Sequence, residues 1–195
     1  MKDDRGVVTH QDKQFVNVNY VEKRLENREF VKCEFVSCDF TKSDLRNNDF
    51  VDCIFRQCNF TLALIDGAGF RDINFIGCKI MGVNFSRCNS FMFSFSFQDC
   101  YMDYSSFLST KLRKTIFNNC SLKEAEFSEA DLTNAEFINC DLSGATFSNT
   151  NLEKCDLRTA RNFAIDPGIN RMKKAKFSSG NLSGLLNKFN LDIEY

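Results

Sequence analysis

The chain has 195 residues, enough for one ordinary domain, and no Pro-, Gly- or Ser-rich linker divides it. Its 25 Lys and Arg residues nearly balance 26 Asp and Glu residues, which argues against direct nucleic-acid binding, because non-specific binding needs an excess of cations. The N-terminal residues lack the apolar core of a signal peptide, and no segment has the roughly 18 apolar residues of a membrane helix. We therefore expect a cytoplasmic protein with no membrane partner.

Residues 1–29 follow the pattern of the rest of the chain only loosely. Phe15, Tyr20 and Leu25 keep a spacing of five, but Lys13 stands where an inward-facing residue would be needed. We expect an irregular N-terminal coil here. The one histidine, His10, has no partner nearby in the sequence, and we interpret it as a free residue of this segment.

Residues 30–157 contain an internal repeat of period five, clearest between Thr115 and Leu157. This period fits neither a helix nor a strand, so the chain must turn at every repeat. Four repeats then make a square coil of 20 residues, and residues 20 apart stack about 4.8 Å apart. The repeat predicts an all-β quadrilateral solenoid. Its apolar centres are Phe30, Phe35, Phe40, Leu45, Phe50, Phe55, Phe60, Ile65, Phe70, Phe75, Ile80 and Phe85, then Phe97, Met102, Phe107, Leu112, Phe117, Leu122, Phe127, Leu132, Phe137, Leu142, Phe147, Leu152 and Leu157.

The residue two places before each centre must also point inward, and it is usually small, with Asn48 and Ile73 as the exceptions. All ten cysteines occupy this position, counting Cys88, which continues the spacing just before the slip. Cysteine behaves as a compact hydrophobic residue when it is buried, so we interpret the thiols as packing residues. Stacked parallel thiols do not have the geometry of a disulfide, and reduced cysteines are expected in a cytoplasmic protein.

The two series of centres meet at residues 87–96, where the register slips by two residues. The segment has two possible conformations. It forms either a small bulge, whose apolar residues fold inward, or a short protruding loop. In the second case Phe91, Met92 and Phe93 are partly exposed and form a contact site for a partner.

Residues 158–195 leave the repeat and contain the only proline, so we expect an irregular crossing segment followed by a capping helix and a short final strand. The apolar face of this segment packs either on the last coil or on a second copy of itself across a two-fold axis. The second possibility predicts a homodimer interface made by Leu182, Leu185, Leu186, Phe189, Leu191 and Ile193.

Charge is distributed unevenly along the chain. Residues 97–157 contain five basic and ten acidic side chains, whereas residues 158–195 contain seven and three. A rod with regularly spaced carboxylates can present a DNA-like surface, although any solenoid also needs surface charge for solubility. The acidic residues placed just before a centre are Glu126, Asp131, Glu136, Asp141 and Asp156. The basic residues Arg171, Lys173, Lys174 and Lys176 either contact phosphate or face the acidic coils.

No arrangement of residues indicates catalysis. The sequence has no nucleophile–base pair, no glycine-rich phosphate loop and no metal-ligand spacing. We therefore expect a protein that is not an enzyme and that needs no cofactor or metal.

The repeats resemble those of the pentapeptide repeat proteins over Phe30 to Leu157. Within that family the chain looks most like the topoisomerase-protecting branch, which comprises Qnr-type quinolone-resistance proteins and the albicidin- and microcin-immunity proteins. The resemblance rests on FVDCIFRQCNFTLALI, FIGCKIMGVNF, IDPGINRMKKAKFS and GLLNKFNLDIE. Many Qnr-type proteins also carry long loops that project from the coils. This sequence differs, because its only candidate for such a loop is the short segment of residues 87–96.

This resemblance implies a right-handed quadrilateral β-helix with a C-terminal capping helix, and a dimer joined through the C-terminal segment. It also implies that the protein mimics DNA, binds DNA gyrase or topoisomerase IV and protects it from a poison. The alternative is a non-catalytic solenoid that binds another bacterial protein through Phe91, Met92 and Phe93.

Overall fold

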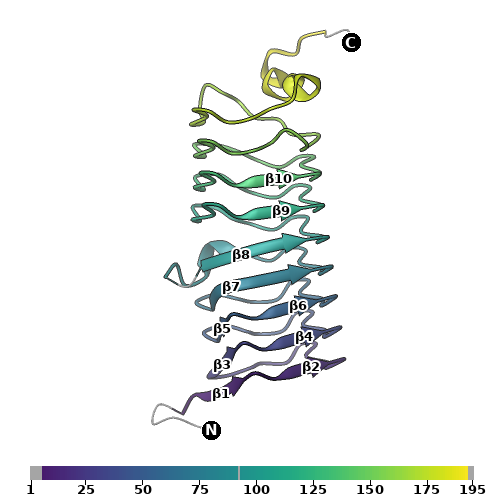
Figure 1. Ribbon diagram of the computed structural model, residues 1–195, viewed down its shortest axis with the longest axis vertical. Coiled ribbons are helices and arrows are strands. Elements are labelled where there is room, and N and C mark those ends of the chain that lie inside the picture. Colours follow the sequence, from purple (N-terminus) through teal and green to yellow (C-terminus); the bar gives the residue numbers. More distant parts are fainter. Residues whose placement is uncertain (1–5, 92, 193–195) are drawn as a thin grey trace.

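The structure is a computed structural model that describes residues 6–91 and 93–192. The chain winds into a rod in which each coil stacks on the one before it (Figure 1). Parallel pairing joins its strands into one sheet. They are β1 (Val8–Gln11), β2 (Gln14–Val16), β3 (Arg28–Val31), β4 (Glu34–Val36), β5 (Asp49–Val51), β6 (Ile54–Arg56), β7 (Gly69–Ile76), β8 (Phe93–Gln98), β9 (Ile116–Asn118) and β10 (Glu136–Ile138). The fold is a parallel β-helix, as the five-residue period predicted.

Residues 20 apart in the sequence lie side by side on neighbouring coils. β3 pairs with β5 so that Phe30 lies opposite Phe50, and isolated parallel bridges such as Asp131 to Asn151 continue the same register elsewhere. Each side of the rod therefore takes one repeat from every coil. We name the sides by their buried residues. Side A contains Phe30, Phe50, Phe70, Leu112, Leu132 and Leu152; side B contains Phe35, Phe55, Phe75, Phe97, Phe117, Phe137 and Leu157; side C contains Phe40, Phe60, Ile80, Met102, Leu122 and Leu142; and side D contains Leu45, Ile65, Phe85, Phe107, Phe127 and Phe147.

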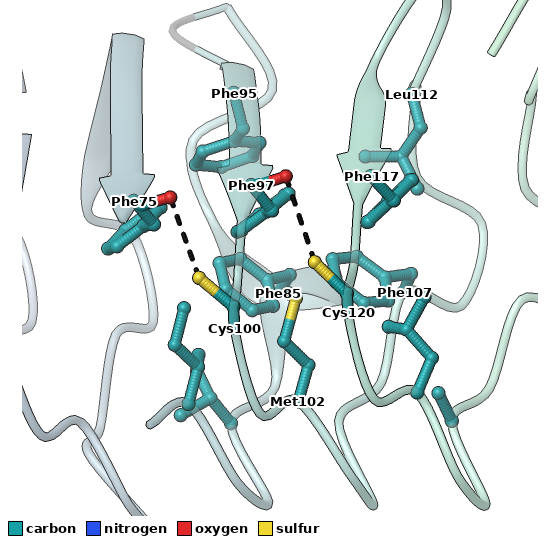
Figure 2. Packing of buried hydrophobic residues seen from close by; sticks show 14 of the residues in the cluster. Phe75, Phe85, Phe95, Phe97, Cys100, Met102, Phe107, Leu112, Phe117 and Cys120 are labelled. Carbon is teal, nitrogen blue, oxygen red and sulfur yellow. Dashed lines mark hydrogen bonds between the residues drawn. The ribbon is translucent and has the colours of Figure 1, made fainter. Parts of the chain in front are cut away.

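Stacked aromatic rings fill the interior of the rod. Phe117 lies between Phe97 and Phe137, with ring centroids 5.2 and 4.8 Å away, and meets Phe107 edge-to-face at 6.0 Å. Figure 2 shows the rings of Phe97 and Phe117 on one side of the coil and that of Phe107 on the opposite side. Offset stacking and edge-to-face contacts both favour aromatic pairs beyond the burial of their area. The core is thus a continuous column that runs through the coils.

The cysteines are free and, except for the half-buried Cys88, buried. Among the described residues, nine of the thiols, all but that of Cys155, donate hydrogen bonds to backbone carbonyls of the preceding coil. Cys100 contacts the oxygen of Phe75 at 3.5 Å and Cys120 that of Phe97 at 3.7 Å (Figure 2). Burial raises the pKa of the Cys53 thiol to about 12. The buried cysteines are packing residues, as the sequence indicated.

The inward-facing amide of Asn48 has partners for its polar atoms. It accepts a hydrogen bond from the backbone N–H of Arg28 at 2.8 Å and donates to the carbonyls of Leu25 and Leu45 at 2.8 and 2.9 Å. A buried amide is stable only when it is paired in this way. This exception to the small-residue rule therefore joins two coils through hydrogen bonds.

Both ends of the solenoid extend further than the sequence indicated. Residues 8–16 form β1 and β2 in register with the next coil, and bridges continue to Arg171 and Lys176 at the C-terminal end. Residues 6–29 are therefore a regular coil, and the segment after Leu157 adds another before the cap. This addition is possible because Phe163 and Ile165 bury their side chains in the core although they leave the five-residue spacing.

The predicted capping helix is present as two short 3₁₀ helices, η2 (Ser179–Leu185) and η3 (Asn187–Phe189). Close packing favours glycine within η2, since a Cβ on Gly184 would lie 2.5 Å from the Phe163 ring. Residues 190–192 form no strand, and the rest of the expected final strand lies outside the described residues. No helix within residues 6–91 and 93–192 has the length and apolar content of a membrane span.

Candidate functional site

The five predicted acidic residues lie on all four sides of the rod rather than on one. Because each repeat occupies one side, Glu126 lies on side D, Asp131 on side A and Asp141 on side C. Glu136 and Asp156 both lie on side B, where a parallel bridge joins them. The structure thus brings together only these last two as immediate neighbours on successive coils.

Three of these carboxylates have nearby cations. Asp131 contacts Arg113 at 2.5 Å, Asp141 lies 3.6 Å from Lys123, and Asp156 lies 2.7 Å from Arg158. Glu126 accepts a hydrogen bond from Ser106 at 3.0 Å, and Glu136 has no ion-pair partner among the described residues. The negative charge is therefore partly neutralised by a nearby cation at Asp131, Asp141 and Asp156 but, within the described residues, not at Glu126 and Glu136.

Hydrogen bonds hold the pKa of several carboxyls low. Those from Arg158 lower the pKa of Asp156 to about 2. Partial burial opposes ionisation of Asp141, but hydrogen bonds from Ser143 and Asn162 outweigh it and lower the pKa to about 2. Both residues are consequently ionised at neutral pH.

The charge of residues 97–157 separates by side, which reasoning along the sequence missed. Sides B, C and D hold eight of the ten acidic residues but only one basic residue, Lys123. The eight are Asp99, Asp103, Glu124, Glu126, Glu129, Glu136, Asp141 and Asp156. Side A holds the other four basic residues. Assigning each repeat to a side, at 20 residues per coil, would have found this pattern.

The register slip produces a protruding loop (Figure 1). Phe75 lies opposite Phe97, so the offset between these coils is 22 residues instead of 20. Phe91 is 96% exposed, whereas Phe93 packs edge-to-face on Phe95 with ring centroids 4.6 Å apart. Met92 lies outside the described residues. The sequence left two conformations open for this segment, an inward bulge and a protruding loop. Phe91 points outward as in the loop, whereas Phe93 packs inward as in the bulge.

The cap exposes a group of apolar side chains at the end of the rod. Leu182, Leu186, Phe189 and Leu191 are exposed, whereas Leu185 packs against the core. Ile193, predicted for the same interface, lies outside the described residues. We call the four exposed side chains the cap patch.

The described residues offer no metal centre, because no group of three or more His, Cys, Asp or Glu side chains could hold an ion. His10 is not a free residue, since it lies in β1 with its ring stacked 4.9 Å from that of Phe30. Burial lowers the pKa of His10, and the charges of Lys13 and Arg28 add to the effect. The candidate site is therefore a set of surfaces: acidic sides, the loop at Phe91 and the cap patch.

Two family profiles match the chain. One, described as pentapeptide repeat region, matches residues 68–147, and the other, described as pentapeptide repeats (8 copies), matches residues 30–61. No curated protein matches the sequence.

Solved structures include proteins with similar folds. HetL, a pentapeptide repeat protein involved in heterocyst differentiation regulation from the cyanobacterium Nostoc, has a TM-score of 0.56 at 16% identity, covering 88% of this chain and 86% of that chain. A trypsin-treated form of QnrB1, a plasmid-mediated fluoroquinolone resistance protein, has a TM-score of 0.47 at 21% identity, covering 96% of this chain and 100% of that chain. The likeness to HetL shows the fold alone.

Proposed function

Because the chain belongs to the pentapeptide repeat proteins, we propose that it binds a bacterial type II topoisomerase as a DNA-like rod and protects it from a poison. The enzyme is DNA gyrase or topoisomerase IV, and the poison is a quinolone, albicidin or a peptide toxin. Pentapeptide repeat solenoids are generally non-catalytic structural or binding proteins, so this function requires binding alone. The sequence resemblance of the run from Phe75 to Phe85 and of the C-terminal segment supports this choice of partner.

The charge density of sides B, C and D is the observation that carries the proposal. Between Phe97 and Thr159, the end of the last repeat on side B, these sides have a net charge of −6, from eight acidic residues, Lys123 and Arg158. Three coils at 4.8 Å each span about 14 Å, which gives about one net charge per 2 Å of rod. Duplex DNA has about one charge per 1.7 Å of its axis. A DNA-binding groove would therefore meet a similar field.

Three carboxylates without ion pairs extend from the corner between sides C and D along side D. Glu124, Glu126 and Glu129 follow one another along a single coil, and none has an ion-pair partner among the described residues. Glu124 and Glu129 are exposed, and Glu126 is half-buried. We assign these three residues the main role in topoisomerase binding.

The test is a titration of the purified protein into gyrase supercoiling and cleavage assays that contain a fluoroquinolone or albicidin. We expect fewer poisoned cleavage complexes as the protein is added. The triple variant Glu124→Gln/Glu126→Gln/Glu129→Gln should protect at least tenfold less well. The control Glu22→Gln/Glu26→Gln/Asp52→Asn removes three charges from the other end of the rod and should protect normally. Neither rescue nor inhibition at tens of micromolar wild-type protein would contradict the proposal.

A second candidate function is binding of another bacterial protein through the loop. The observation in its favour is the exposure of Phe91, because phenylalanine is enriched at protein interfaces relative to the rest of the surface. The variant Phe91→Ser separates the two candidates. If it protects gyrase as well as the wild type while the triple glutamine variant does not, the acidic sides make the contact and the loop has another role.

A further inference from the structure

Side A carries a strip of positive charge between Lys111 and Lys174. Parallel bridges join Lys111 to Asp131, Asp131 to Asn151, and Asn151 to Arg171, so the four repeats are consecutive on one side. These repeats contain seven basic residues and two acidic ones, Asp131 and Glu153. The basic residues are Lys111, Arg113, Lys114, Lys154, Arg171, Lys173 and Lys174. We call this surface the basic strip.

Most of the cations in the basic strip are available to an external partner. All seven are exposed, whereas the two acidic residues are half-buried. Only Arg113 forms an ion pair among the described residues, with Asp131. That carboxylate also accepts hydrogen bonds from Thr133 and Asn151. The other six cations therefore present uncompensated positive charge to solvent.

The cations form two groups separated along the rod axis. Lys111, Arg113 and Lys114 lie on one coil, and Arg171, Lys173 and Lys174 lie three coils further on, which is a distance of about 14 Å. A groove of about 410 Å³ lies between the groups, and its charged lining residues are Arg113 and Arg171 together with Glu129 and Asp131. This separation is close to the width of the DNA major groove, about 12 Å, so the two groups match phosphates on its two edges.

We propose that the basic strip binds the phosphate backbone of duplex DNA. This inference does not depend on the proposed topoisomerase, because its cations lie on side A, although Glu129 of the acidic surface lines one edge of the groove. The near-zero net charge of the chain does not oppose it, since that value averages over all four sides. Side C lies opposite side A across the core, and charges separated by more than about 10 Å are largely screened at 0.1 M salt.

Duplex DNA fits this surface better than an acidic protein does. Protein interfaces depend on buried apolar or aromatic anchors, and Ile169 is the exposed large apolar residue that lines the groove. Phosphate contacts need cations but no apolar anchor. Binding without base contacts also predicts that the affinity is independent of DNA sequence.

The test measures fluorescence anisotropy of a labelled 20-base-pair duplex titrated with the full chain between 50 and 200 mM salt. Six phosphate contacts predict a slope of about −5 for log K against log salt. The variant Lys111→Glu/Lys114→Glu/Lys173→Glu/Lys174→Glu should weaken binding more than tenfold. The control Lys13→Glu/Lys23→Glu/Lys42→Glu/Lys79→Glu makes the same change in net charge at exposed lysines elsewhere, and it should keep at least half of the wild-type affinity.

A second variant with fewer substitutions tests the proposal even if the four-residue variant does not fold. Lys173→Ala/Lys174→Ala should keep the circular dichroism spectrum and reduce the salt slope by about 2, one unit for each lost phosphate contact. No binding by the wild type at 50 mM salt would overturn the proposal, as would equal losses in the strip variant and its control. Displacement of the duplex by polyglutamate at equal charge concentration would also overturn it, because the strip would then favour an acidic protein.

Discussion

At the scale of single residues, each corner of the coil requires an unusual backbone conformation. At most centres the residue two places later has a positive φ, for example 52° at Lys42, 58° at Leu62 and 66° at Gly82; Arg87 and Thr159 are exceptions. This left-handed region is disfavoured for most residues, and Asn, Asp and Gly tolerate it best. Many corners are occupied by Asn, Asp or Gly, which explains part of the polar composition of the repeat. Leu62 is poorly suited to its corner, because leucine does not favour a positive φ.

Replacing Leu62 by asparagine should stabilise the protein. The side chain is 50% exposed, so the lost burial is small, while the strain at its φ of 58° is relieved. We expect the free energy of unfolding to rise by about 0.5–1 kcal/mol, less than the roughly 1–2 kcal/mol cost of a left-handed residue, because asparagine still bears part of that cost. Urea titration measures this change. The control is Leu64→Asn, because Leu64 is 48% exposed but is not among the positive-φ residues. An equal gain in both variants would contradict the explanation.

At the scale of the elements, a coil is stable mainly because its side chains pack between those of its neighbours. β8, β9 and β10 form a parallel ladder on side B, and each contributes one phenylalanine to a continuous stack. The strands are short, with three residues in β9 and β10, so backbone pairing alone stabilises them little. Ring stacking and burial supply most of the cohesion between coils.

Removing one ring from this stack should be costly. Phe117 is fully buried between Phe97 and Phe137, and Phe117→Ala leaves a cavity that rigid coils cannot close. We expect a loss of about 3–5 kcal/mol in the free energy of unfolding. Its neighbour Ile116 is 41% exposed and faces outward, so Ile116→Ala should cost less than about 1 kcal/mol. Comparable losses for the two variants in thermal or urea unfolding would show that stacking is not the main source of stability.

At the scale of the whole molecule, the rod has chemically distinct surfaces. Residues 97–157 are acidic on sides B, C and D, the basic strip occupies side A, and the cap patch is apolar. A group of exposed apolar side chains at one end suits a symmetric contact with a second copy, because a two-fold interface uses the same patch twice. We therefore propose a homodimer joined through the cap patch.

Light scattering tests the dimer. The wild type should have twice the 22.4 kDa mass of the chain, and Leu182→Asp/Phe189→Asp should give a folded monomer, because both side chains are exposed. Leu185→Asp is a poorer test, since Leu185 packs on the core and its loss would also destabilise the cap. The control Leu64→Asp places one charge on an exposed leucine of the rod and should remain dimeric. A monomeric wild type would contradict the proposal.

The sequence by itself determined the coil, the inward-facing centres and the role of the cysteines, because each of these follows from the position of a residue within a local repeat. The five-residue spacing places Phe117 and Cys120 inside wherever their coil lies. The same local reasoning did not show that Phe91 points outward while Phe93 packs inward, because the path of the slip depends on how Phe95 fills the core.

The tertiary structure decided how the surfaces before and after the slip align, whereas counting repeats at 20 residues per coil would have assigned the charges of residues 97–157 to their sides. Glu126, Asp131, Glu136 and Asp141 hold the same place in successive repeats, yet each lies on a different side of the rod. The side depends on the number of residues in each coil, including the two added at the slip, and long-range packing sets that number. Local spacing therefore determines whether a residue is inside or outside, whereas the stacking of coils determines its neighbours.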